Sequence, residues 1–140
     1  MELANGGDLQ GRIKRAIATK TRIPENEIWR VGYNVLEGLQ KLHENNILHR
    51  DIKPANLFFH DGVAKIADLN ISKHLVDQFT HTQTGTPYYA APEIWNEEPY
   101  GFKCDIWSLG CVLYEMAMLR QPFKADTPQK LFKRIAVGEY

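Results

Sequence analysis

Apolar residues recur at helical spacing in two segments near the start of the chain. In the first, Leu9, Ile13 and Ile17 follow Asp8, whose carboxylate is placed to cap the first turn of a short helix. A second, longer helix is predicted from Pro24 in its first turn to a stop at Asn45-Asn46. Its apolar stripe consists of Ile28, Val31, Val35, Leu39 and Leu42.

The pattern changes in the middle of the chain. Two short apolar runs, residues 57–59 and 63–67, flank His60-Asp61-Gly62, and this turn chemistry predicts a small antiparallel hairpin. Residues 74–86 are polar and show no periodicity, which indicates a long functional loop and not a linker.

Two further helices are predicted towards the end of the chain. Residues 103–119 are apolar on nearly every face, a pattern typical of a helix buried all round. Asp126, followed by Pro128 and Gln129, is expected to start a last amphipathic helix. The core positions of that helix are Leu131, Phe132 and Ile135.

Composition narrows the class of protein. A chain of 140 residues with 44% hydrophobic and 24% charged residues suits one globular domain. The formal net charge is zero, so we expect neither nucleic acid nor a membrane as a partner. Residues 1–10 lack a signal peptide pattern, and the apolar stretch 106–119 is too short to span a bilayer. A soluble intracellular protein is expected, with Cys104 and Cys111 reduced.

One stretch carries most of the candidate chemistry. Within twenty residues the chain combines an acidic residue that can act as a base, a lysine, and two residues whose side-chain oxygens can bind a metal. Phosphoryl transfer from ATP requires such groups. The acid would orient and deprotonate a hydroxyl, the cation would lie near the phosphate, and the oxygens would bind Mg²⁺. These residues are the run His49-Arg50-Asp51-Ile52-Lys53-Pro54-Ala55-Asn56 and then Asp68.

This run resembles the catalytic loop of protein kinases, HRD-x-K-x-x-N, and further landmarks of that family follow it. They are Asp68-Leu69-Asn70 in place of DFG, Gly85-Thr86-Pro87-Tyr88-Tyr89, Ala91-Pro92-Glu93 in place of APE, and Asp105-Ile106-Trp107-Ser108-Leu109-Gly110. The chain resembles a Ser/Thr protein kinase throughout. Asp68-Leu69-Asn70, together with residues 82–89, is similar to the NIMA-related (NEK) kinases.

The resemblance implies an α+β, mainly α fold. Residues 1–140 would form a partial kinase domain, namely the large (C-terminal) lobe with a small β-hairpin, with the N-terminal lobe absent. Residues 68–93 would be the activation segment. Asp68-Leu69-Asn70 departs from DFG at two positions, but asparagine tolerates left-handed backbone, so the bend after Asp68 can survive.

Roles in the reaction follow from the resemblance. Asp51 would be the catalytic base, Lys53 would supply charge to the moving phosphate, and Thr86 would contact both. Asn56 and Asp68 would bind Mg²⁺. The ordinary alternatives are a turn cap for Asp51 and loop hydrogen bonding for Asn56 and Asp68.

ATP is the implied nucleotide. Glu2 and Ala4 would offer backbone groups to adenine, Asp8 would meet the ribose, and Phe58 would form the floor under the base.

Regulatory and supporting residues are implied as well. Arg50 would hold a phosphate on Thr82, added by an activating kinase or by autophosphorylation, and thereby order the loop. Thr80 and Thr84 are competing phosphosites, and a solvated threonine is the plain alternative. Scaffold roles are implied for His49 packing on Leu69, for Glu93 pairing with an arginine beyond residue 140, and for Asp105.

Three functions therefore stay open. The favoured one is transfer of the ATP γ-phosphate to Ser/Thr hydroxyls of protein substrates, with this chain alone incomplete and inactive. A non-catalytic, truncated kinase-like binding module is the alternative. A small-molecule phosphotransferase is disfavoured, because such enzymes lack the segment from Gly85 to Glu93. The resemblance places the protein in the cytoplasm, with a possible association with the cytoskeleton or cilium.

Overall fold

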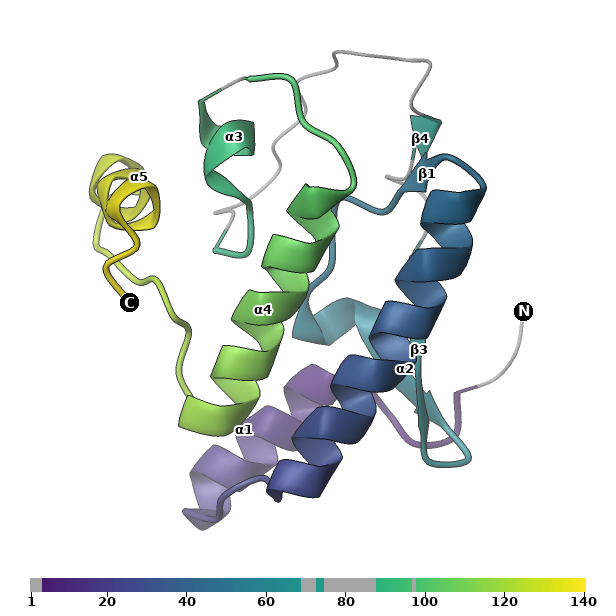
Figure 1. The fold of residues 1–140 in the computed structure, drawn as a ribbon. Helices are drawn as coiled ribbons and strands as arrows, with labels where there is room; N and C mark the ends of the chain where they lie inside the picture. The colour runs from purple at the N-terminus through teal and green to yellow at the C-terminus, as the bar shows by residue number, and fades with distance from the viewer. Residues whose placement is uncertain (1–3, 69–72, 75–87, 97) are drawn as a thin grey trace.

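The computed structural model describes residues 4–68, 73–74, 88–96 and 98–140, with the backbone alone for 73–74. This part of the chain is mostly helical, with two small antiparallel strand pairs. In Figure 1, α4 runs between α2 and α5, and α1 lies beneath α2 and α4. The elements are α1 (Leu9–Thr19), α2 (Glu25–Glu44), β1 (Ile47–Leu48), the 3₁₀ helix η1 (Pro54–Asn56), β2 (Leu57–His60), β3 (Val63–Ile66), β4 (Lys73–His74), α3 (Pro92–Trp95), α4 (Lys103–Met118) and α5 (Pro128–Val137).

The first helix forms as predicted. The Gly11 amide donates to Asp8 Oδ1 at 2.6 Å, so Asp8 is the N-cap. Leu9, Ile13 and Ala16 are buried, whereas Ile17 is 50% exposed, contrary to the predicted stripe. Positions four apart turn by about 400°, so the stripe drifts around the helix, and Ala16 faces the core instead.

The second helix supplies the middle of the core. Val31, Val35 and Leu39 are buried, and α2 packs against β3 and α4. The helix ends at Glu44, as predicted. Pro24 is the N-cap and not a first-turn residue, because its backbone is still extended with ψ at 139°. The main core cluster comprises Leu9, Ile13, Val31, Val35, Leu39, Ile52, Leu57, Phe59, Ala64, Leu109, Val112 and Met116.

The predicted hairpin is confirmed. β2 pairs with β3 from Leu57↔Ile66 to His60↔Val63, and Asp61 and Gly62 both have positive φ, at 48° and 79°. Two left-handed residues in succession match the twist of a two-residue hairpin.

A short strap from the beginning of the chain extends this hairpin. Gly6 N donates to Phe59 O, and Phe59 N donates to Gly7 O, both at 2.9 Å. A β-bridge joins Asp8 to Phe58. The strap therefore fixes the start of α1 to the strand that follows η1.

The pairing of β1 with β4 was not predicted. The two strands are antiparallel, with Ile47 opposite His74 and Leu48 opposite Lys73. A helix after Ala91-Pro92-Glu93 was expected from the family resemblance, and residues after Ala91 form the single-turn helix α3, which contacts α5.

The last two long helices occur where they were predicted, but with two corrections. α4 is not buried all round, because Ile106 is 46% and Met118 52% exposed. The N-cap of α5 is Thr127 and not Asp126, since the Lys130 amide donates to Thr127 Oγ1 at 3.3 Å. The core positions Leu131 and Ile135 are buried. None of the helices in the described ranges is long and apolar enough to cross a membrane.

The two cysteines are free and buried, as expected from the sequence. Burial raises the pKa of each thiol to about 12, with neighbouring carboxylates adding to the effect. Both thiols are therefore protonated at neutral pH.

Candidate active site

The loop after β1 brings the candidate base, lysine and asparagine into direct contact. Lys53 Nζ lies 2.7 Å from Asp51 Oδ2. Asn56 Nδ2 donates to the same oxygen at 2.8 Å and to the Asp51 carbonyl at 2.9 Å. The Asp51 and Lys53 side chains stay 24% and 37% exposed, so the group is reachable from solvent.

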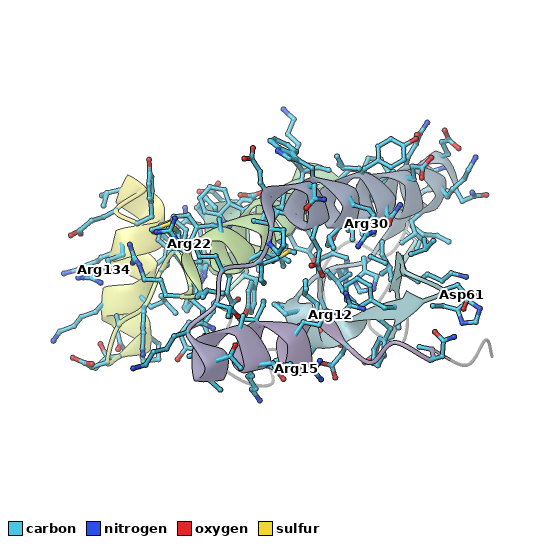
Figure 2. All side chains as sticks on the ribbon, turned by 90° about the horizontal axis from the view of Figure 1, so that it is seen from below. Arg12, Arg15, Arg22, Arg30, Asp61 and Arg134 are labelled. Carbon is cyan, nitrogen blue, oxygen red and sulfur yellow. The ribbon has the colours of Figure 1, made fainter. Side chains whose placement is uncertain are left out.

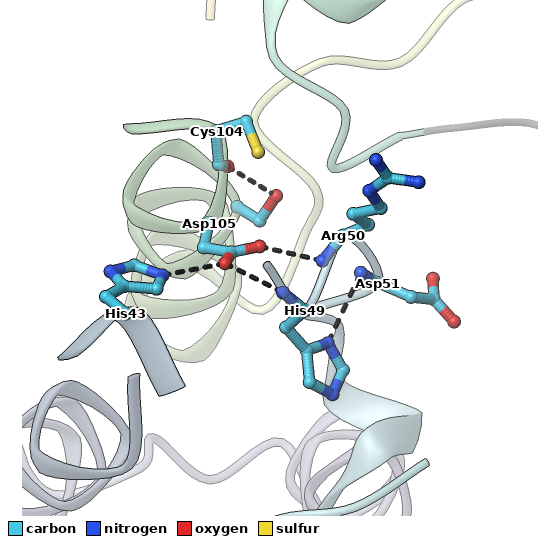
Figure 3. A network of polar contacts seen from close by, with 7 residues as sticks. His43, His49, Arg50, Asp51, Cys104 and Asp105 are labelled. Carbon is cyan, nitrogen blue, oxygen red and sulfur yellow. Dashed lines mark hydrogen bonds and ion pairs between the residues drawn. The ribbon is translucent and has the colours of Figure 1, made fainter. Parts of the chain in front are cut away.

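Asp105 of α4 holds this loop from behind (Figure 3). It is fully buried, and its Oδ2 and Oδ1 accept the backbone amides of His49 at 3.0 Å and Arg50 at 2.8 Å. His43, on the last turn of α2, places Nε2 2.9 Å from Asp105 Oδ2. A carboxylate can only accept, so this nitrogen donates. These contacts agree with the scaffold role that the resemblance implies for Asp105, because they fix the loop of Asp51 to α4.

His49 is also fully buried, and its two contacts determine the tautomer. The Asp51 amide donates to His49 Nδ1 at 3.3 Å, and His49 Nε2 lies 3.1 Å from the Ala67 carbonyl. An amide donates and a carbonyl accepts, so these bonds require a neutral ring with the proton on Nε2. The histidine therefore links the loop of Asp51 to the segment that leads to Asp68. Its predicted packing partner, Leu69, lies outside the described residues.

The two candidate metal ligands are brought together by the hairpin. The Ala67 amide donates to the Asn56 carbonyl at 2.9 Å, so Asp68 follows directly after the residue paired with Asn56. Asp68 has φ of 65°, a left-handed conformation that is uncommon for an aspartate. Because Asn56 uses its amide nitrogen on Asp51, its Oδ1 is the atom suited to a cation.

This donor set fits Mg²⁺ in its chemistry, since carboxylate and amide oxygens are hard ligands. A cage made only of protein groups is not required, because Mg²⁺ keeps several waters and binds substrate phosphates. The described residues contain no cluster of three or more His, Cys, Asp or Glu side chains placed for a metal.

The predicted nucleotide-binding residues lie partly within the described chain. The β-bridge places Asp8 beside Phe58, next to the hairpin strand that follows Asn56. Ala4 is half-buried at the start of the strap, and Glu2 lies outside the described residues. Asp8 already uses Oδ1 as the cap of α1, a role that the sequence also predicted.

Arg50 directly precedes Asp51 in the loop and has a left-handed backbone conformation, with φ of 71°. Its guanidinium carbon is 5.2 Å from the centre of the Tyr100 ring, a cation–π contact that the sequence did not predict. Arg50 Nε is buried without a hydrogen-bond partner among the described residues. A buried unused donor suits an anion. The predicted phosphosite Thr82 and the predicted contact residue Thr86 lie outside the described residues.

Glu93, for which an arginine partner beyond residue 140 was expected, is half-buried on α3, and its side chain makes no hydrogen bond within the described ranges.

A half-buried carboxylate that was missed is Glu115 of α4. Tyr89 donates its hydroxyl to Glu115 Oε2 at 2.6 Å, and Gln121 donates to the same hydroxyl at 3.4 Å. Burial raises the pKa of Glu115, although the Tyr89 hydrogen bond lowers it, and burial strongly raises the pKa of Tyr89. The sequence signal for Glu115 was a single acid within the apolar stretch 106–119.

Comparison with known proteins matches this architecture to one family. The family model described as "Protein kinase domain" matches residues 1–138. A probable serine/threonine-protein kinase nek2 of Dictyostelium discoideum is 41% identical over 145 residues, which cover 100% of this chain and 35% of that protein. Serine/threonine-protein kinase Nek3 of Mus musculus is 42% identical over 142 residues, covering 99% of this chain and 27% of Nek3. The G2-specific protein kinase fin1 of Schizosaccharomyces pombe is 35% identical over 160 residues, covering 99% of this chain and 22% of fin1. The chain thus spans about a third or less of the length of these relatives.

Proposed function

Because this chain belongs to the protein kinase family and is similar to NEK kinases, we propose that the protein transfers the γ-phosphate of ATP to Ser/Thr hydroxyls of protein substrates. One observation carries the proposal: Asp51 is held by Lys53 and Asn56 on a loop that a buried carboxylate fixes in place. A solvated turn cap would not need this set of contacts.

Asp51 acts as the base in this proposal. Both of its side-chain contacts with described residues fall on Oδ2, which leaves Oδ1 to receive the proton of a substrate hydroxyl. The hydroxyl oxygen forms a bond to the γ-phosphorus, the bond from phosphorus to the bridging oxygen breaks, and ADP leaves with the electron pair. Lys53, within reach of the same carboxylate, stabilises the charge on the transferring group.

Asn56 and Asp68 would hold Mg²⁺, which neutralises charge on the phosphates when it is bound. Ala4 and Glu2 would contact adenine through their backbones, with Asp8 at the ribose and Phe58 beneath the base. Thr86 would contact Asp51 and Lys53.

Regulation follows from the same site. A phosphate on Thr82, within the proposed activation segment 68–93, would bind the guanidinium of Arg50, with Nε as one donor. An activating kinase or autophosphorylation would supply it. We propose a cytoplasmic protein, associated with the cytoskeleton or cilium.

The test compares Asp51→Asn with the exposed control Asp126→Asn in the full-length protein, assayed with ATP, Mg²⁺ and a generic Ser/Thr substrate. We expect Asp51→Asn to lower kcat by about 10²–10⁴-fold, because proton transfer by a positioned side chain contributes that much. Unchanged activity in Asp51→Asn would reject the assignment.

The alternative is a non-catalytic binding module formed by this chain alone. We expect the isolated chain to have little activity, because a nucleotide cleft without closure loses positioning and water exclusion. An antibody against α2 distinguishes the two. A cellular species of about the 16.1 kDa calculated for this chain would favour the module, and a longer species alone would exclude it.

A further inference from the structure

Basic residues are concentrated in and after α1, although the whole chain has no net charge. Between Asp8 and Glu25 the sequence contains no acidic residue. It contains the basic residues Arg12, Lys14, Arg15, Lys20 and Arg22. The local charge is therefore strongly positive and must be balanced elsewhere on the molecule.

Among the described residues, only one of these cations forms an ion pair. Arg12 donates to Glu27 at 2.8 Å, and its guanidinium carbon lies 3.4 Å from the centre of the Phe59 ring. Figure 2 shows Arg12 on the side of α1 that faces α2 and Arg15 on the outer side. The other four cations are exposed, and within the described ranges none of them forms an ion pair. These four residues, on α1 and in the segment directly after it, are named the basic α1 face: Lys14, Arg15, Lys20 and Arg22.

The basic α1 face is built on rigid backbone. Lys20 is the C-cap of α1 in left-handed conformation, and the end of the helix is closed by amide bonds to Ala16 O and Ile17 O. Just beyond it, the hydroxyls of Thr19 and Thr21 are 2.8 Å apart. The backbone that carries these cations is thus ordered before a partner binds, which reduces the backbone entropy lost on binding.

The basic α1 face is also close to the candidate active site. α1 packs against η1, the turn that contains Asn56, and the strap joins its first residue to β2. An eleven-residue helix is about 16 Å long, a distance that about five extended residues span. One substrate chain could therefore reach both.

We propose that the basic α1 face docks an acidic segment of the protein substrate, a step that rests on the proposed function. Charge complementarity argues for this occupant, because four exposed cations that form no ion pair with any described residue attract a run of carboxylates or phosphates. A membrane fits less well. An interfacial helix inserts an apolar face, but Leu9, Ile13 and Ala16 are buried in the core and Ile17 alone is an exposed large apolar residue of α1.

Direct binding tests the inference without requiring catalysis. The full-length protein is titrated into fluorescein-labelled oligoglutamate, with oligoglutamine as the neutral probe. The test variant combines Lys14→Gln, Arg15→Gln, Lys20→Gln and Arg22→Gln. The control variant makes the same change in net charge at other exposed positions, with Lys103→Gln, Lys124→Gln, Lys130→Gln and Lys133→Gln.

We expect fluorescence anisotropy to show that the test variant binds oligoglutamate about tenfold or more weakly, while the control variant binds like the wild type. Equal affinity in the two variants would overturn the inference. Vesicles containing phosphatidylserine, and duplex DNA, are titrated in parallel. Binding of either one through the basic α1 face, with no binding of oligoglutamate, would also overturn it.

Kinetics then separates docking from the proposed function. Two Ser peptides differ only in a glutamate or a glutamine tract, set about five to ten residues from the serine. The glutamate peptide should have the lower KM, and the test variant should abolish that advantage while kcat stays unchanged. If both peptides are phosphorylated with the same KM, the result contradicts the docking proposal and leaves the proposed function intact. A failure to phosphorylate either peptide would contradict the proposed function and leave the binding result to decide docking.

Discussion

Lys53 Nζ lies 2.7 Å from Asp51 Oδ2, and both side chains remain partly exposed. An exposed ion pair two residues apart would contribute little to stability, because solvent screens it and the long lysine side chain loses entropy. The pair is better explained by chemistry than by folding. In the proposed reaction it would orient Asp51 and keep a cation where negative charge develops on a transferring phosphate.

Replacing Lys53 by methionine should therefore affect catalysis and not stability. We expect kcat to fall by about 10²–10³-fold, the typical loss when one electrostatic stabiliser is removed from an active site. Lys41→Met is the matched control, since Lys41 is exposed on α2 and, among the described residues, its ammonium pairs with Glu44 alone, at 3.8 Å. The assay measures kcat and the urea midpoint of both variants. A large loss of stability in Lys53→Met with normal kcat would refute this account.

Replacing Asp105, in contrast to Lys53, should lower the stability of the protein. The buried Asp105 carboxylate accepts two backbone amides and His43 Nε2, so Asp105→Asn turns part of this acceptor set into a donor. We expect the free energy of unfolding to fall by about 2–4 kcal/mol, because a buried charged network loses a partner. Chemical denaturation measures the change, and Asp126→Asn should stay within about 0.5 kcal/mol of the wild type. Equal stability of the two variants would show that the network is not needed to hold the loop.

The sequence predicted those elements whose signals are local. The structure confirms three such signals: the N-cap Asp8, the hairpin turn at Asp61-Gly62 and the apolar stripe of α2. Each of them depends on residues that are close together in the sequence. The spacing of Asp51, Lys53 and Asn56 is also local, and their contacts follow from it.

What was missed depends on residues far apart in the chain. Three contacts join segments whose relative positions only the packed core determines. They are the β1–β4 pairing, the cation–π contact between Arg50 and Tyr100, and the hydrogen bond from His43 to Asp105. No periodic pattern encodes such a register. The exposure of Ile106 was missed for a related reason, because a helix with many apolar faces does not reveal which one lacks a neighbour.

Gly6 should resist substitution because the strap lies directly on β2. A Cβ added at Gly6 would sit 2.6 Å from Phe59 Cβ, so Gly6→Ala must displace the strap and its two hydrogen bonds to Phe59. We expect a loss of about 1–3 kcal/mol in the free energy of unfolding, the usual cost of overpacking. Gly101→Ala is the matched control, because an added Cβ there meets nothing within 4 Å. Thermal or urea unfolding of both variants checks the difference, and similar values would show that the strap shifts without cost.

Glu115 should give the stability of the protein a specific pH dependence. Burial raises its pKa in the folded state above the ordinary value of 4.5. Between 4.5 and that raised pKa the folded protein binds more protons than the unfolded chain, so the free energy of unfolding falls as pH rises through this window. Glu115→Gln cannot titrate and should lose this decline, while it can still accept the Tyr89 hydroxyl.

Urea unfolding from mildly acidic to neutral pH measures the effect as the difference between the wild type and Glu115→Gln. Glu139→Gln, at an exposed carboxylate, should leave the slope unchanged. Tyr89→Phe removes the hydrogen bond that lowers the pKa of Glu115, so it should extend the decline to higher pH. A Glu115→Gln curve parallel to that of the wild type would mean that the carboxylate titrates as it does in the unfolded chain, and that its burial has no consequence for stability.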